Sequence, residues 1–160
     1  MYHFVFGRSP IRTLVRAALA SALLIGGSRV VLTPLRATGI SMAPTYRDGE
    51  LLLVNRLAYL RHPPGRGDVV ALRLGGGGAA LVKRVIALPG ERVRIDRGAV
   101  FVDGLGLDEP YVIQRAPWDV AEVTIQPGQV FVIGDNRGMP ARLHDFGVAS
   151  TDRLMGRLVY

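Results

Sequence analysis

Lys83 is the residue whose type points most directly to chemistry, because it is the only lysine among the 20 basic residues of the chain. It lies in an apolar run, Leu81-Val82-Lys83-Arg84-Val85. Burial among apolar side chains disfavours the charged form of a lysine, so its pKa falls and its neutral amine can accept a proton. Arginine cannot replace it in this role, because the guanidinium group stays protonated. The single lysine therefore indicates a general base.

Ser41 is the candidate nucleophile for such a base. It lies in a turn, Gly39-Ile40-Ser41-Met42-Ala43-Pro44. A serine hydroxyl is a poor nucleophile until a neighbouring base takes its proton. Three histidines are alternative bases: His3 precedes a long apolar segment, His62 lies in a proline-rich loop, and His144 keeps a Ser–His arrangement open.

A third segment, Gly134-Asp135-Asn136-Arg137, follows an apolar run and has the composition of a tight turn. Each of the three segments also has a plain structural interpretation. Serine is a common turn former, Gly-Asp-Asn is a turn signature, and a lone lysine can survive a base-composition bias. The three together, in this order, are far more specific than any of them alone.

Short strands are the elements that must position these residues. The chain has 20 glycines and 10 prolines, and no helical periodicity is visible after Thr38. The pattern predicts an all-β, compact, β-barrel-like domain of eight to ten short antiparallel strands, with turns at Gly75–Gly78, Asp96–Gly98 and Gln126–Gly128. The strand candidates are Leu51–Asn55, Asp68–Leu74, Ala79–Ala87, Arg92–Ile95, Ala99–Val102, Val120–Ile125, Gln129–Ile133 and Arg153–Val159.

Residues 13–35 form an apolar segment that precedes this domain. Its uninterrupted core, Ala17–Ser28, is shorter than the roughly 20 residues that a spanning helix needs. Arg16 and Arg29 at its borders can extend to the two membrane interfaces, and Pro34 is expected to end the helix. The sequence thus predicts a cytoplasmic segment 1–12, a single transmembrane helix 13–35 and an exported domain 36–160.

Charge supports this orientation. Residues 1–47 contain six arginines and no acidic residue, whereas residues 48–160 carry 14 basic and 13 acidic residues. Basic residues before a helix keep that side in the cytoplasm, and a nearly neutral domain argues against nucleic acid as a partner. Two alternatives for the segment remain: a cleavable signal peptide with Ala18-Leu19-Ala20 as its site, and a buried amphipathic helix. The chain has no cysteine, so it forms no disulfide.

At this point the sequence resembles the type I signal peptidase family, the membrane-anchored Ser–Lys endopeptidases. The resemblance runs along nearly the whole chain. The segments that carry it are Ser41–Thr45, Gly67–Val70, Lys83–Val85 with Pro89-Gly90, Val102–Tyr111, Gly134–Arg137 and Gly156.

The resemblance implies a role for several residues. Ser41 would be the nucleophile and Lys83 the general base, and the backbone N–H of Ser41, in the turn Ile40-Ser41-Met42, would contribute to the oxyanion hole. Ala37, Leu81 and Val82 would flank a groove in which the substrate adds as an extended strand. The family cuts after small-x-small sites, so shallow pockets near Met42 would accept alanine-sized side chains. Glycine at position 39 removes a hydroxyl donor that some members have there.

The chain departs from the family after Gly134–Arg137. Pro140 stands where members commonly have a serine that positions the lysine, and Arg142 and His144 replace an Asp-x-Arg pair. His144 and Asp145 are candidates to orient Lys83 instead. The other expected supports are Arg84, paired with Asp135, and the turn residues Asn136 and Arg137.

The resulting hypothesis is a minimal, membrane-bound peptidase that removes signal peptides from exported preproteins, with no metal or organic cofactor. Its partners would be preprotein signal peptides and the lipid bilayer. The sequence leaves open a relative dedicated to one substrate such as a conjugative pilin, and an inert membrane-tethered binding module. A self-cleaving stress-response repressor would need a DNA-binding region in place of the apolar segment.

Overall fold

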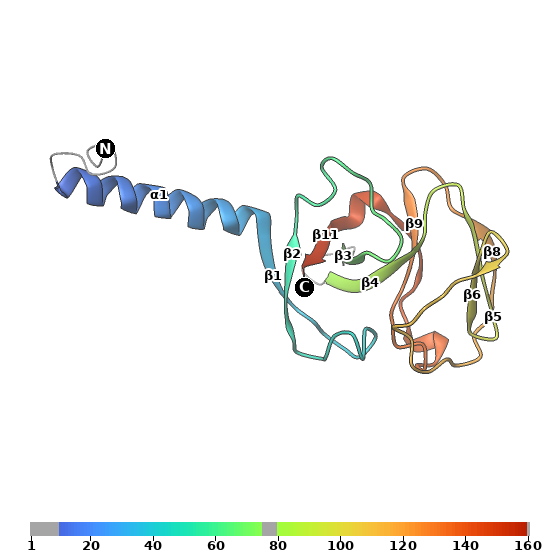
Figure 1. Ribbon diagram of the computed structural model, residues 1–160. Helices are drawn as coiled ribbons and strands as arrows, with labels where there is room; N and C mark the ends of the chain where they lie inside the picture. Colours follow the sequence, from blue (N-terminus) through green and yellow to red (C-terminus); the bar gives the residue numbers. More distant parts are fainter. Residues whose placement is uncertain (1–9, 75–79, 160) are drawn as a thin grey trace.

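The computed structural model describes residues 10–74 and 80–159, which form one α-helix, two short 3₁₀ helices (η1 and η2) and two antiparallel β-sheets. The larger sheet has the strand order β1-β2-β11-β3-β4-β9-β10 and the smaller one β7-β6-β5-β8 (Figure 1). The elements in chain order are α1 (Pro10–Val31), β1 (Leu32–Arg36), β2 (Leu51–Asn55), β3 (Val69–Arg73), β4 (Ala80–Ala87), β5 (Arg92–Asp96), β6 (Ala99–Val102), β7 (Leu105–Gly106), β8 (Val120–Thr124), β9 (Gln129–Ile133), η1 (Ala141–Leu143), β10 (Gly147–Ser150), η2 (Thr151–Arg153) and β11 (Leu154–Val159).

The prediction of a mostly β fold is confirmed, but the predicted closure of the strands into a barrel-like sheet is not. All eight predicted strands are present, and β2, β6 and β9 have the predicted bounds. The strands pair into two open sheets, and no pairing among the described residues closes either sheet into a barrel. The turn at Gln126–Gly128 separates β8 of one sheet from β9 of the other. The predicted turn at Gly75–Gly78 lies in 75–79, outside the described residues, as do His3 and Arg8.

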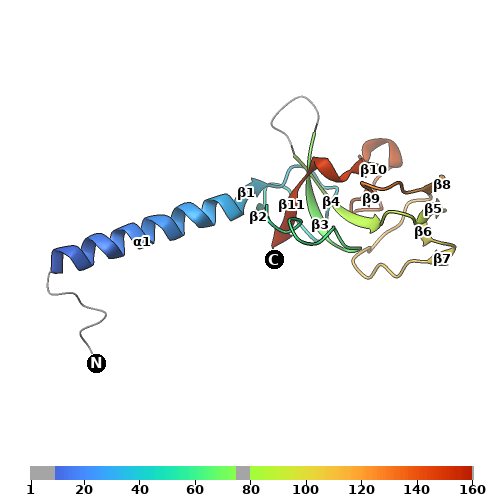
Figure 2. The same cartoon turned by 90° about the horizontal axis from the view of Figure 1, so that it is seen from above.

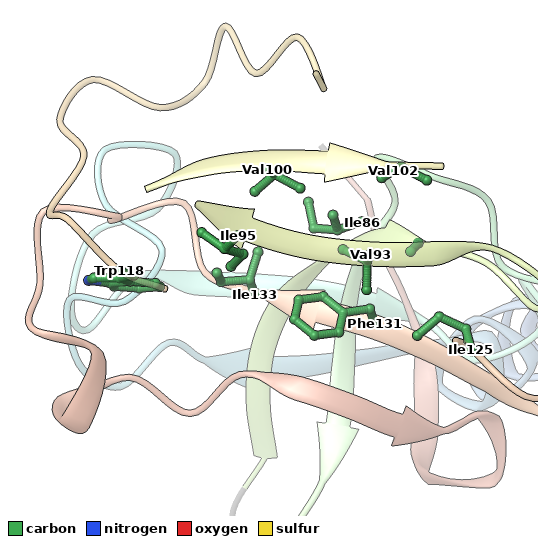
Figure 3. Close-up of a cluster of buried hydrophobic side chains, with 10 residues drawn as sticks. Ile86, Val93, Ile95, Val100, Val102, Trp118, Ile125, Phe131 and Ile133 are labelled. Carbon is green, nitrogen blue, oxygen red and sulfur yellow. The ribbon is translucent and has the colours of Figure 1, made fainter. Parts of the chain in front are cut away.

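Strand β4 connects the two halves of the domain. Its first half pairs with β3 from Ala80 to Arg84, and its second half pairs with β9 from Arg84 to Ala87. Figure 3 shows the core where β5 and β6 cover β9, with Ile86 of β4 among the buried side chains. This packing fixes the far end of β4. The other members of the core cluster are Ala87, Val93, Ile95, Val100, Val102, Trp118, Ile125, Phe131 and Ile133.

Helix α1 ends earlier than predicted, and the chain continues as a strand. The helix stops at Val31, and Leu32–Arg36 pairs with β2 in the register Pro34↔Leu53. Proline suits this position because β1 is an edge strand, where a missing N–H costs no ladder bond. The predicted helix boundary at residue 35 is therefore wrong, since the apolar run to Leu35 belongs partly to the sheet.

Helix α1 extends away from the β domain in both views (Figures 1 and 2). Ile11, Leu14 and Leu19 are each at least 60% exposed. In the described part of the chain, no helix combines the length and apolar character needed to cross a membrane.

Candidate active site

Ser41 and Lys83 lie within hydrogen-bonding distance although 42 positions separate them in the chain. The Lys83 Nζ–Ser41 Oγ distance is 2.9 Å. Lys83 comes from the first half of β4 and is only 2% exposed, while Ser41 comes from the turn that follows β1. The distance is within the range for a base that takes a proton directly from a hydroxyl.

Burial has the effect on Lys83 that the sequence led us to expect. It lowers the pKa of Lys83 from 10.5 to about 8, because the charged amine is poorly solvated among apolar neighbours. The carboxylate of Asp145 opposes this change and raises the pKa of Lys83. A pKa near 8 leaves an appreciable neutral fraction of the amine near neutral pH, which a solvent-exposed lysine lacks.

The turn that carries Ser41 is held by the Gly134–Arg137 segment. The backbone N–H of Asn136 donates to the Ser41 carbonyl at 3.0 Å, and its side-chain amide donates to the Ile40 carbonyl at 3.0 Å. Gly134 lies so close that a Cβ there would clash with the Ser41 carbonyl oxygen. Glycine at position 134 and asparagine at position 136 therefore let the two turns pack directly on each other.

A buried ion pair connects the same segment to β4. Arg84 donates to both carboxylate oxygens of Asp135, at 2.9 Å from Nε and 2.6 Å from Nη2. Thr45, four residues beyond Ser41, donates its hydroxyl proton to Asp135 at 2.5 Å. Asp135 therefore joins the strand that carries Lys83 to the chain that carries Ser41. The Arg84 guanidinium also stacks on the ring of Tyr111, 4.0 Å from its centroid.

Arg137 is buried and pairs with a residue that sequence reasoning did not single out. Its guanidinium donates to the Gly134 carbonyl and to both carboxylate oxygens of Glu109, which is also buried. Glu109 accepts a further bond from Arg115 at 2.7 Å. The Glu-Pro-Tyr segment at Glu109–Tyr111 was visible in the sequence, but nothing local showed that its carboxylate would meet two arginines.

His144 and Asp145 lie beside Lys83 and occupy different surroundings. His144 is 5% exposed and packs edge-on against Trp118 at 4.8 Å between ring centroids. Among the described residues, neither ring nitrogen makes a hydrogen bond of good geometry, although backbone groups of Asn136 and Asp145 lie near enough to raise the pKa slightly. Burial, with the positive charge of Lys83 as the next cause, lowers the pKa of His144 to about 4. His144 is thus a neutral packing residue at neutral pH and makes no hydrogen bond to Lys83.

A small cleft adjoins Ser41. Its walls include the predicted groove residues Ala37, Leu81 and Val82, together with Met42, and its volume is about 20 Å³. We call it the Ser41 cleft; the remaining lining residues are Thr38, Gly39, Tyr46 and Ala80. Ile40, the other predicted residue of this turn, does not line the cleft and is 55% exposed.

The edge of β4 beside this cleft is open. Ala80–Lys83 pair with β3 on one side, and β9 pairs only with Arg84–Ala87 on the other. Among the described residues, the first half of β4 therefore has an unpaired edge that can accept an extended peptide. Among all the residues that the structure describes, no cluster of His, Cys, Asp and Glu side chains is suited to hold a metal ion.

Comparison with known proteins gives a consistent result. The family described as signal peptidase, peptidase S26, matches residues 11–160. A probable signal peptidase I-1 of Synechocystis is 35% identical over 155 residues, which cover 92% of this chain and 78% of the relative. Signal peptidase I of Bacillus caldolyticus is 33% identical over 134 residues, which cover 75% of this chain and 73% of the relative. A crystal structure of a signal peptidase I from Enterococcus faecalis has 27% identity and a TM-score of 0.49, covering 60% of this chain and 97% of that one.

Proposed function

Because the chain belongs to the signal peptidase family, peptidase S26, we propose that Ser41 and Lys83 form the catalytic dyad with which it cuts. The chain is a serine endopeptidase of the signal peptidase I type, and its substrates are preproteins that carry signal peptides. The observation that supports the dyad is the 2.9 Å contact between the Ser41 hydroxyl and a lysine that is 2% exposed.

In the first half of the reaction, neutral Lys83 accepts the hydroxyl proton of Ser41 as Oγ attacks the carbonyl carbon of the scissile bond. The carbonyl oxygen becomes an oxyanion, and the backbone N–H of Ser41 donates a hydrogen bond to it. The tetrahedral intermediate collapses when Lys83 returns its proton to the departing amine. The products are a free N-terminus and an acyl ester on Ser41.

In the second half, Lys83 takes a proton from a water molecule that attacks the ester carbonyl. Collapse of this intermediate breaks the ester bond, and the proton on Lys83 returns to Ser41. The released signal peptide then carries a new C-terminal carboxylate. One base serves both halves, so its protonation state controls the whole cycle.

Incubating the purified, detergent-solubilised chain with a test preprotein that has an Ala-x-Ala site should give one cut after the second alanine. Ser41→Ala should cut at least about 10³-fold more slowly, since the nucleophile is lost. Mass spectrometry of the product locates the cut. A folded wild type that leaves the preprotein intact, or an S41A variant with wild-type activity, would contradict the proposal.

The reaction should depend on pH through Lys83. Only the neutral amine accepts a proton, so kcat/KM is expected to fall about tenfold per unit of pH below the Lys83 pKa of about 8. In Asp145→Asn the carboxylate that raises the pKa of Lys83 is removed, and the acid limb should move to lower pH. Asp119→Asn, an exposed change beside the smaller sheet, is the control. An unshifted limb in D145N would show that Asp145 does not act on Lys83.

The small volume of the Ser41 cleft supports a preference for a small residue directly before the cut. About 20 Å³ is room for a methyl-sized group. We place the alanine-sized side chain of a small-x-small site there, with the substrate extended along the open edge of β4.

Attachment to the cell membrane through α1, with the N-terminus cytoplasmic and the catalytic domain on the exported side, is also part of the proposal. Its support is the exposure of Ile11, Leu14 and Leu19, and the six arginines in residues 1–47 without an acidic residue. In liposomes, the full chain should float with the lipid. A chain lacking residues 1–31 should float less, and equal flotation of both would contradict a role for α1.

A further inference from the structure

The Lys83 amine becomes a charged ammonium group when it takes the proton of Ser41, and the fold must accommodate that charge. Lys83 is 2% exposed. Among the described residues, the only hydrogen bond of its amine is the 2.9 Å contact with the Ser41 hydroxyl. An ammonium group has three N–H donors, and a buried donor without an acceptor is costly. The protonated state therefore needs a further acceptor close to Nζ.

Pro140 and Asp145 are poorly placed to supply this acceptor. Pro140 is exposed, and its side chain has no polar atom. Asp145 is exposed as well. It acts on Lys83 through its charge, without a hydrogen bond or an ion pair to Lys83 among the described residues.

His144 is a buried side chain beside Lys83 with unused hydrogen-bonding capacity. It is 5% exposed, and within the described part of the chain neither ring nitrogen makes a hydrogen bond of good geometry. A neutral imidazole has one N–H, so its other nitrogen keeps a lone pair that can accept a hydrogen bond. The next two residues, Asp145 and Phe146, line a cavity of about 220 Å³ together with Lys83.

The backbone places the His144 ring next to both members of the dyad. The pairing of β4 with β9 ends one residue short of Lys83 and of Gly134, so these two residues are opposite each other where the strands separate. A Cβ on Gly134 would lie 2.6 Å from Cε1 and 3.0 Å from Nε2 of His144, and it would clash with the Ser41 carbonyl oxygen. The ring edge of His144 and the turn of Ser41 therefore meet at Gly134.

Aromatic neighbours hold the ring in this place. Trp118 contacts the His144 ring edge-on at 4.8 Å between centroids, and Phe146 does so at 6.2 Å. Trp118 is itself fixed, because its indole N–H donates to the Met139 carbonyl at 2.8 Å. A ring held in this way can fix the end of a flexible lysine side chain.

We propose that His144 is the positioning residue of Lys83, and that its unprotonated ring nitrogen accepts a hydrogen bond from the Lys83 ammonium that forms when Ser41 attacks. The inference rests on the proposed function and adds the group that holds the base between its two proton transfers. One N–H of the ammonium gives its proton to the departing amine, while another is held by His144. No covalent bond to His144 forms, and the ring keeps its own proton throughout.

The surrounding charges keep the ring available as an acceptor. Burial, and after it the positive charges of Lys83 and Arg137, lower the pKa of His144 to about 4, while backbone groups of Asn136 and Asp145 oppose this change. The ring is therefore neutral over the whole pH range in which Lys83 titrates, and its lone pair is present when the ammonium forms.

The test compares His144→Phe, which keeps a ring and removes the acceptor, with His144→Gln, whose amide oxygen restores one. With saturating Ala-x-Ala preprotein, kcat of H144F should fall about 10–100-fold, as expected for the loss of one hydrogen bond to a charged group, and KM should change less than about twofold. H144Q should recover to within about fivefold of the wild type.

The pH profile gives a second readout that a loss of packing alone would not move. In H144F the acid limb should shift to lower pH, because the ammonium form of Lys83 has lost a stabilising acceptor. His62→Phe makes the same change at an exposed histidine and should leave both kcat and the acid limb unaltered.

His144→Leu repeats the test with a smaller apolar side chain, in case the phenyl ring does not fit beside Gly134, and thermal melts show which variants are folded. A folded H144F or H144L with wild-type kcat and an unshifted acid limb overturns the inference. Equal losses in all three variants would make His144 a packing residue only, and a loss of at least about 10³-fold in H144Q would make it the base. A wild type that cuts no preprotein would instead refute the proposed function, and the inference with it.

Discussion

Replacing Lys83 with arginine is expected to reduce kcat by at least about 10³-fold while keeping the positive charge. The guanidinium cannot lose its proton, so the Ser41 hydroxyl 2.9 Å away would have no base. Single-turnover cleavage of the Ala-x-Ala preprotein measures the loss of the chemical step. Raising the pH should not restore activity to K83R, because no accessible pH deprotonates arginine.

Two further variants separate the chemistry from stability. Lys83→Met replaces the buried side chain with an uncharged one of similar length, so a folded K83M that is equally inactive assigns the loss to the missing amine. Arg97→Lys makes the reciprocal change at a side chain that is 87% exposed and should leave activity unaltered. Substantial cleavage by K83R, with a thermal melt like that of the wild type, would refute Lys83 as the base.

Asp135→Asn should be the most destabilising single change near the site. The Asp135 side chain is fully buried, and it neutralises Arg84, whose side chain is 9% exposed. Removing one charge of a buried pair leaves the other uncompensated, which typically costs about 3–5 kcal/mol. The free energy of unfolding in urea should fall by this amount.

The activity of D135N should fall as well, because Asp135 also accepts the Thr45 hydroxyl and so joins the Ser41 segment to β4. Asp96→Asn provides the matched control. Asp96 pairs with Arg94 at 3.2 Å, but its side chain is 47% exposed, and exposed pairs of this kind contribute about 1 kcal/mol or less. Equal losses of unfolding free energy in D135N and D96N would show that the buried Arg84–Asp135 pair stabilises the fold no more than the exposed Arg94–Asp96 pair does.

Sequence reasoning succeeded where the pattern is local. The strand at Leu51–Asn55 alternates between exposed and buried side chains, and glycines mark the turns beside β5 and β6. It failed at Leu32–Arg36, because an apolar run that follows a helix can continue the helix or enter a sheet. Pairing with β2 decides between the two, and that pairing is a long-range contact.

The same distinction applies to the site. The single lysine and the serine turn were visible as residue types, and the fold brings them within 2.9 Å. The partner of Arg137 was not visible, because Glu109 lies 28 positions away in an irregular segment. A cavity of about 220 Å³ that Lys83 and Asp145 help to line could not have been predicted either. Its walls come from β3, β4, β9 and β10, which are separate in the sequence and come together only in the fold.

The fact that Lys83 is both unique and buried makes it a natural spectroscopic reporter. If the chain is produced with isotope-labelled lysine, NMR should show a single side-chain signal, since no other lysine exists to overlap with it. Its titration would read the protonation of the dyad directly, without a substrate. Signal peptides, inhibitors and the D145N change could then be compared by how far each moves that one resonance.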